Sequence, residues 1–167
     1  MACLGVHFAL TDEEVAKLRS FATDSERLDY LQTEIEEKYF SSDSDYLAES
    51  DKAWDAMHRL LSDGELSYYD GPEPLRFAVI GGEPIYSQPD YIMSLKTPSE
   101  VKAVSKALST IDEADFRKRY EAIDEWKYGF SKSADDCDYT FSWFHGIVDF
   151  FDKAAAEGRH VLFTADQ

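Results

Sequence analysis

One helix-forming stretch places a histidine and a tryptophan beside two aspartates. Residues 50–61 read SDKAWDAMHRLL. On a helical wheel Trp54 lies in the apolar face, and His58 lies at its rim, next to Asp51 and Asp55. An imidazole flanked by carboxylates has its charged form favoured, which suits a proton donor or a hydrogen bond to a neighbouring loop. We favour a structural interpretation, in which Trp54 is core and His58 bonds a backbone carbonyl to seal the helix against that loop.

Two consecutive glycines are the second candidate. Gly81 and Gly82 follow the apolar run LRFAVI, and a glycine-rich turn after a strand can cradle a phosphate. Here Glu83 and Pro84 follow, where a phosphate site needs backbone amides and the start of a helix. A turn that ends a strand is the simpler interpretation. The candidate pocket or partner site therefore consists of Asp51, Trp54, Asp55, His58, Gly81 and Gly82.

Other reactive residue types do not form a catalytic or metal-binding pattern. Ser142, His145 and Asp149 are spaced to lie on one polar stripe of a helix, but a hydrolase needs these groups to converge on a substrate beside separate oxyanion donors. Cys3 and His7 share a strand face, and two ligands without a third are weak evidence for zinc. We expect no catalytic residues, no metal and no cofactor.

The charge balance excludes some classes of partner. The 167 residues include 34 acidic and 17 basic side chains, so the formal net charge is 17 − 34 = −17. Such a surface repels nucleic acid and anionic lipid and favours a basic protein, although solubility alone is a sufficient reason for it. The chain has no membrane-spanning apolar run and no signal peptide at its start, and its two cysteines show no disulfide or metal spacing. We expect a cytoplasmic protein.

Apolar periodicity and capping residues predict alternating strands and helices. Thr11 and Thr23 each precede a glutamate by three residues, which is the pattern of a capping box. We expect strands at 3–10, 75–80, 91–96 and 160–165, a polar connection at 41–50, and helices following Thr11, from Thr23 to about Tyr39, and at 51–61, 97–108, 110–120 and 139–157. Strands separated by helices predict a layered α/β fold with a mixed β-sheet.

Several segments in succession resemble the YfbM-like family, which is a domain-of-unknown-function family. They are SDKAWDAMHRLL, PLRFAVIGGEPI, YIMSLKTPSEVKAVSKALSTIDEADFRKRY and the aromatic helix that ends in GRHVLFTA. The likeness covers nearly the whole chain, so residues 1–167 are interpreted as a single YfbM-like domain. The resemblance implies a three-layer α/β sandwich with helices on both sides of the sheet. It implies no activity and no catalytic residues.

Two function classes remain open. The leading hypothesis is a non-catalytic acidic protein that binds a basic protein, for example as an immunity or regulatory protein against a basic toxin. The alternative is a small-molecule-binding domain or enzyme with a pocket near Trp54, His58 and the Gly81–Gly82 turn. The aromatic helix at 139–157 also allows homodimerisation, so either a monomer or a homodimer fits the sequence.

Overall fold

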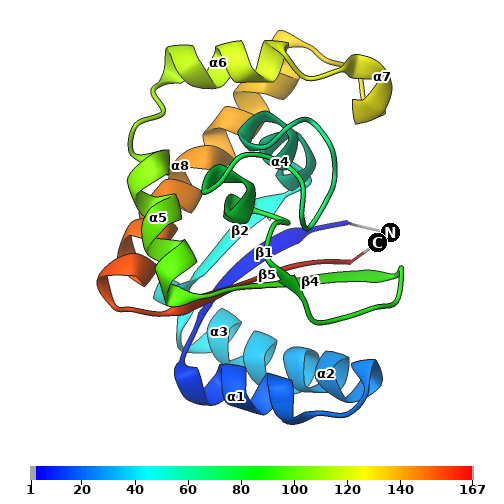
Figure 1. Cartoon of the computed structure of the whole chain (residues 1–167), viewed down its shortest axis with the longest axis vertical. Helices are drawn as coiled ribbons and strands as arrows, with labels where there is room; N and C mark the ends of the chain where they lie inside the picture. Colours follow the sequence, from blue (N-terminus) through cyan, green and yellow to red (C-terminus); the bar gives the residue numbers. More distant parts are fainter. Residues whose placement is uncertain (1–2, 167) are drawn as a thin grey trace.

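Alternation along the strands divides the core into two halves, one on each face of a sheet. The computed structural model describes residues 3–166. In the first strand, β1 (Gly5–Leu10), Phe8 and Leu10 face one hydrophobic cluster, whereas Ala9 faces the other. Successive side chains of a strand point to opposite faces, so a strand that is buried on both faces requires a covering layer on each side. Helices supply both layers (Figure 1).

The sheet has five strands in the order β2-β1-β5-β4-β3. Besides β1, they are β2 (Leu47–Asp51), β3 (Glu83–Pro84), β4 (Tyr91–Lys96) and β5 (His160–Asp166). All neighbouring strands pair antiparallel. The predicted α/β sandwich is confirmed, but the expectation of a mixed sheet is wrong.

The helical connections explain the antiparallel order. Phe8 near the end of β1 pairs with Leu47 at the start of β2, and Lys96 at the end of β4 pairs with Val161 near the start of β5. Each connection therefore leaves the sheet at one end of the strands and returns at that same end, as Figure 1 shows. A parallel neighbour would need a connection that crosses to the opposite end of the strands.

One helical layer covers the face that carries Phe8 and Leu10. It consists of α1 (Asp12–Ser20), α2 (Asp24–Tyr30), a π-helical turn (Leu31–Glu36) and α3 (Glu37–Ser41), followed by a 3-10 turn (Ser44–Tyr46). The predicted capping boxes are present at Thr11 and Thr23. Each threonine accepts a backbone N–H that the first helical turn leaves without a partner, which is why both helices begin where the sequence indicated.

The other helical layer packs on the opposite face of the sheet (Figure 1). It consists of α4 (Trp54–Leu61), a 3-10 turn (Leu75–Ala78), α5 (Pro98–Leu108), α6 (Glu113–Glu121), α7 (Glu125–Tyr128) and α8 (Ala134–Ala156). The inner side of α8 buries Phe144, Ile147 and Phe151 against α5 and the sheet. Most of the aromatic stripe of α8 is thus core.

Two predicted segments are wrong for identifiable reasons. The expected polar connection at 41–50 contains β2, an edge strand whose inward side chains Ala48 and Ser50 are too small to give an apolar signal. The expected strand at 75–80 is a 3-10 turn followed by irregular backbone, wedged between α4 and α5. Its apolar run reflects burial on all sides, which a short run cannot distinguish from strand pairing.

Candidate functional site

The six residues singled out in the sequence lie at two different places. His58, Gly81 and Gly82 belong to the interior, where α4 and the segment after the 3-10 turn meet the sheet. Trp54 is 3% exposed and belongs to the core, as expected, whereas Asp51 and Asp55 beside it are partly exposed. The predicted site thus divides into a closed interior cluster and a region that reaches the surface near the start of α4.

His58 is fully buried rather than at a rim. Its Nδ1 accepts the backbone N–H of Ile80 at 3.3 Å, so the proton of the neutral ring is on Nε2. That nitrogen faces the backbone of Glu65 but has no hydrogen bond within 3.5 Å among the described residues. The expected rim position is wrong because the segment around Ile80 packs over that side of the helix. His58 does seal the helix against this segment, but it accepts an amide proton instead of bonding a carbonyl.

The two glycines allow this segment to pack tightly. A Cβ on Gly81 would lie 2.2 Å from the backbone oxygen of Arg76, and a Cβ on Gly82 would lie 2.7 Å from that of Leu95. Gly82 also has φ of +136°, a region that other residues rarely adopt. The glycines therefore serve backbone packing. The larger cavities described below are not lined by His58, Gly81 or Gly82.

Sequence reasoning did not connect two further basic residues with this cluster. Lys96, at the end of β4, is fully buried, and its Nζ donates to the Val79 carbonyl, to the Ser94 carbonyl at 3.2 Å and to the Ser94 hydroxyl at 3.0 Å. His7 on β1 is also fully buried, and its Nε2–H donates to the Ala78 carbonyl at 2.8 Å. The alternation of YIMSLK, which places Lys96 on the same face as Ser94, was the signal available.

These side chains form what we call the buried polar centre: His7, His58, Ser94 and Lys96 around the backbone of residues 78–81. The segment 78–80 has no strand partner, so the side chains provide the hydrogen bonds that a sheet would provide. Lys96 has no carboxylate within ion-pair distance among the described residues. The centre can hold backbone in place, and its four side chains are fully buried, so they do not reach the surface.

Burial shifts the acid–base behaviour of the centre. The pKa of His7 and the pKa of His58 are each lowered to about 3, first by loss of hydration and then by the neighbouring charge of Lys96. Burial likewise lowers the pKa of Lys96 well below its ordinary value, although Glu100 opposes the shift. All three shifts disfavour the charged forms of these buried side chains, so the centre is suited to holding the backbone of residues 78–81 and not to binding an ionic ligand.

The surface half of the predicted site borders a small cavity. Trp54 and Asp55 line a cavity of about 220 Å³ together with Cys3, Lys52 and Phe130, which we call the arm cavity. The indole N–H of Trp54 donates to the Cys3 carbonyl at 3.0 Å. Asp55 pairs with Arg59 at 2.6 Å, and burial raises its pKa. Of the six residues singled out in the sequence, Trp54 and Asp55 line this cavity.

Asp51 was expected in the first turn of the helix, and this expectation is wrong. It is the last residue of β2, with φ of 47°, and its carboxylate accepts the N–H of Lys52 at 2.7 Å. α4 begins three residues later, at Trp54. A helical wheel that starts at Asp51 consequently misjudges which residues flank His58.

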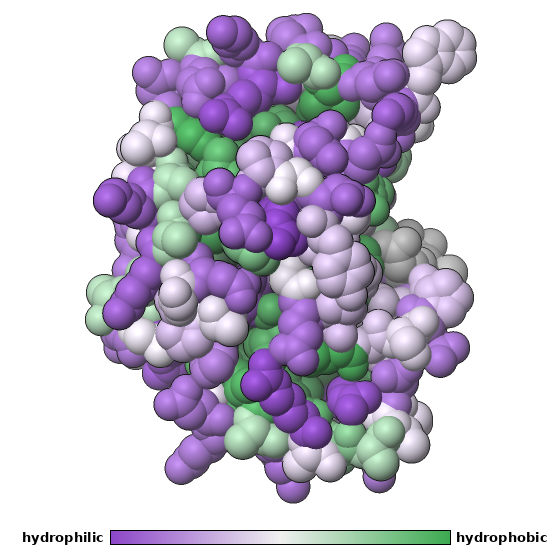
Figure 2. All heavy atoms as spheres, viewed as in Figure 1, coloured by the Kyte–Doolittle hydropathy of each residue, from purple (hydrophilic) through white to green (hydrophobic). Residues whose placement is uncertain are grey.

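The short segment between α6 and α8 carries the most exposed aromatic side chain. We call residues 124–130 the aromatic arm; it contains α7, which projects from the body of the protein in Figure 1. Trp126 is 96% exposed and Phe130 is 59% exposed, and Phe130 also borders the arm cavity. The right-hand outline in Figure 2 is indented below the position of α7 in Figure 1. Exposed tryptophan beside a hollow is typical of partner-binding surfaces.

The charge around the arm is mostly negative. Lys127 pairs with Glu65, which removes the one cation of α7 from the balance. The ion pairs of residues 3–166 include none formed by Asp51, Asp124 or Glu125. Hydrophilic side chains cover most of the face seen in Figure 2. Lys52 also lines the arm cavity, so the region carries charges of both signs. An exposed aromatic group beside carboxylates is suited to a cationic partner.

The remaining chemical candidates give no site. Ser142, His145 and Asp149 are exposed on α8, and the Ser142 hydroxyl donates to the Tyr139 carbonyl at 2.6 Å. Residues 3–166 contain no group of three or more His, Cys, Asp and Glu side chains that could hold a metal. Every helix in the described part of the chain is too short or too polar to traverse a lipid bilayer.

Comparisons with known proteins give a family and a fold. The family described as Domain of unknown function (DUF1877) matches residues 1–164. No curated protein matches the chain. Among solved structures, the crystal structure of a protein of unknown function, YfbM from Escherichia coli, is similar with a TM-score of 0.64 and 18% sequence identity, over 97% of this chain and 99% of that chain. Similarity at this identity shows the fold alone.

Proposed function

Because the chain belongs to the family described as Domain of unknown function (DUF1877), with a YfbM-like fold, we propose its function from its own surface: it is a non-catalytic protein that binds a basic protein. The binding surface is the aromatic arm together with Trp54 and Asp55 of the arm cavity. An immunity or regulatory protein that neutralises a basic toxin is a role of this kind. The protein acts in the cytoplasm.

The exposure of Trp126 is the observation that supports this proposal most. A side chain of this size that is 96% exposed gains free energy when a partner covers it, and tryptophan is frequent among the residues that dominate protein interfaces. Lysine and arginine side chains are attracted to the face of an indole ring. The net charge of −17 accelerates the approach of such a partner, and the effect weakens with salt.

A small-molecule site at the same place has less support. The arm cavity of about 220 Å³ is smaller than the roughly 300–1,000 Å³ of ordinary ligand pockets. His58 and the two glycines, which the alternative required as lining, belong to the buried polar centre. We therefore place the protein partner first.

Affinity capture at two salt concentrations tests the proposal. The immobilised full chain is expected to retain a specific basic protein from its native cytosol at low salt and to release it at roughly 0.5 M salt, where exposed charges are screened beyond a few ångströms. The variant Trp126→Ala is expected to retain at least about tenfold less. Phe40→Ala is the matched control, because Phe40 is 49% exposed on α3 in the other helical layer.

Retention that is indifferent both to salt and to Trp126→Ala counts against the proposal. Equal losses in the Trp126 and Phe40 variants also count against it, since they would indicate a general surface effect.

A further inference from the structure

A larger cleft lies at the free edge of the sheet. It has a volume of about 590 Å³, and we call it the edge cleft. Its floor is the extended segment 83–87, which contains β3, the outermost strand. One wall comes from the α1–α2 junction and the other from Tyr68 and Tyr69. The volume falls within the range of ordinary binding pockets, and none of its lining residues belongs to the aromatic arm or the buried polar centre.

The backbone of the floor has hydrogen-bonding groups that β4 does not use. Ile85 N–H donates to the Met93 carbonyl of β4 at 3.0 Å. In an antiparallel pair the neighbouring residues direct their backbone groups the other way, so the Pro84 carbonyl and the Tyr86 N–H point away from β4. No backbone bond from Tyr86 N–H is found among the described residues. A further strand added beside β3 could bond to both of these groups.

One of the backbone groups on this open side of the edge already has a hydrogen-bond partner. Gly82 N–H donates to the Tyr68 carbonyl at 3.2 Å, so the chain at Tyr68 pairs with the edge just before Pro84. The same carbonyl accepts from Arg76 at 3.0 Å, which holds it in place. The edge is therefore used as a pairing template at Gly82 and is open from Pro84 onward.

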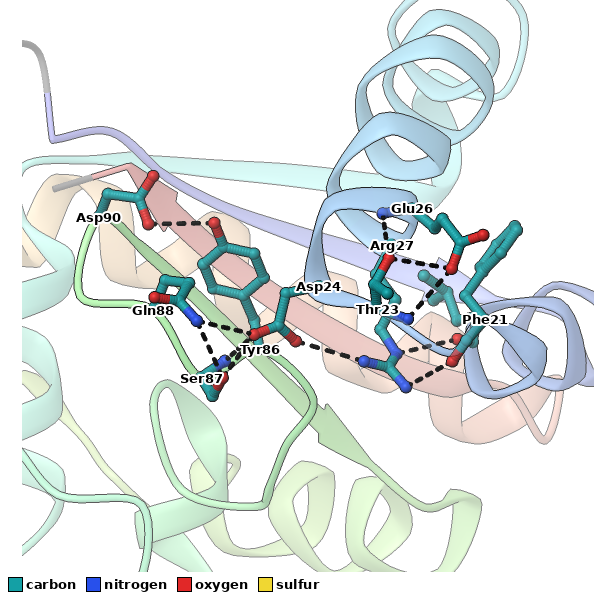
Figure 3. A network of polar contacts seen from close by, with 10 residues as sticks. Phe21, Thr23, Asp24, Glu26, Arg27, Tyr86, Ser87, Gln88 and Asp90 are labelled. Carbon is teal, nitrogen blue, oxygen red and sulfur yellow. Dashed lines mark hydrogen bonds and ion pairs between the residues drawn. The ribbon is translucent and has the colours of Figure 1, made fainter.

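The wall on the helical side is built in advance (Figure 3). The Asp24 carboxylate accepts from Ser87 through its N–H at 3.1 Å and its hydroxyl at 2.5 Å, and from Arg27 at 3.3 Å. Arg27 also donates to the carbonyls of Leu18 at 3.2 Å and Phe21 at 2.7 Å, which closes the end of α1. Hydrogen bonds from two directions thus tie the floor to the wall, and little ordering is left for a ligand to impose.

Only exposed groups need to move for a ligand to enter. Arg19 and Glu83 pair at 2.6 Å, and about half of each side chain is exposed, so little free energy holds the pair together. Tyr69 is 69% exposed beside Tyr68. The cleft consequently offers an aromatic wall, a separable pair of opposite charges and a backbone edge between them.

We infer that the edge cleft binds an extended peptide segment, which adds to β3 through the Pro84 carbonyl and the Tyr86 N–H. Alternate side chains of the peptide then meet the two walls, an apolar or aromatic one at Tyr69 and a charged one at Arg19 and Glu83. Pro84 has no N–H to donate, which keeps the pairing short and protects the edge from unlimited strand addition. This inference is independent of the proposed function.

Peptide selection followed by backbone methylation tests the inference. A phage-displayed library of random twelve-residue peptides is selected on the full chain, and the best binder is synthesised for fluorescence anisotropy. N-methylation of its amides one at a time is expected to weaken binding by about tenfold or more at one amide, the one that donates to the Pro84 carbonyl, and not at its two neighbours, because neighbouring amides of a strand point the other way. Tyr69→Ala is expected to raise Kd by about tenfold, and Trp126→Ala is expected to leave it unchanged.

The inference is overturned if no peptide is enriched, or if methylation weakens binding at consecutive amides or at none. It is also overturned if binding survives Tyr69→Ala. A peptide that loses affinity in Trp126→Ala alone binds the aromatic arm, which supports the proposed function and contradicts the inference about the edge cleft.

Discussion

Acid titration of the buried polar centre yields a quantitative prediction. His7 and His58 have an ordinary pKa of 6.5 and a folded-state pKa of about 3. Below pH 6.5 the unfolded chain therefore binds up to two protons that the folded chain refuses, so stability is complete above pH 6.5 and is lost as the pH falls. The loss per histidine approaches about 1.4 kcal/mol per pH unit well below pH 6.5, and it amounts to about 3 kcal/mol for both histidines between pH 6.5 and pH 5. That is a large share of the roughly 5–15 kcal/mol of a typical domain.

The variant His58→Gln isolates one of the two contributions. Glutamine keeps an acceptor for the Ile80 N–H but does not titrate. Between pH 6.5 and pH 5 the variant is expected to lose about 2 kcal/mol less than the wild type. Urea unfolding followed by circular dichroism at half-unit pH steps measures the difference. Surface carboxylates and net charge are common to both proteins, so their effects cancel.

A control keeps the interpretation specific. His145→Gln removes a histidine from the exposed face of α8 and is expected to follow the wild-type curve. Parallel pH profiles for the wild type and His58→Gln would contradict this prediction, because they would mean that burial of His58 does not exclude its charged form.

Three further predictions concern stability. Burial lowers the pKa of Lys96, so between its folded-state pKa and its ordinary pKa of 10.5 the unfolded chain binds one proton more than the folded chain. Wild-type stability should therefore rise with pH over that range by up to about 1.4 kcal/mol per unit, and Lys96→Met should remove this rise in urea titrations from pH 8 to 10. Gly81→Ala should destabilise the protein by about 3 kcal/mol because its Cβ would meet the Arg76 carbonyl, whereas Gly129→Ala, with open space but φ of +74°, should cost about 1 kcal/mol; thermal melts that rank the two equally would contradict the packing argument. Trp126→Ala should change the free energy of unfolding by less than about 0.5 kcal/mol, and a larger loss in chemical denaturation would mean that the ring is structural.

Local signals predicted the elements that local interactions determine. The capping boxes at Thr11 and Thr23 place partners for free amides within three residues, so α1 and α2 begin where the sequence indicates. The alternation of residues 91–96 likewise predicted β4. The predictions for polar β2 and for the apolar 3-10 turn were wrong because distant segments determine the environment of both. β2 is an edge strand, and the turn is enclosed by α4 and α5.

The candidate site shows the same boundary. A wheel can place His58 beside Trp54, but only tertiary packing brings the backbone of Ile80 over the ring. Alternation could have placed Lys96 beside Ser94 on the inner face of the sheet, whereas its contact with Val79 joins segments 17 residues apart. No periodicity marks Trp126, because exposure of a single ring depends on what the rest of the chain leaves uncovered.

Site-specific crosslinking in the native cytosol can show whether the aromatic arm binds a basic protein. A photoreactive benzoylphenylalanine replaces Trp126 in one variant and Phe40 in another, and adducts are identified by mass spectrometry. We predict one discrete adduct at position 126, formed with a segment rich in lysine and arginine. This adduct disappears at high salt, and no such adduct forms at position 40. Identical adduct patterns at the two positions, or a salt-resistant adduct at position 126 to an acidic segment, would contradict it.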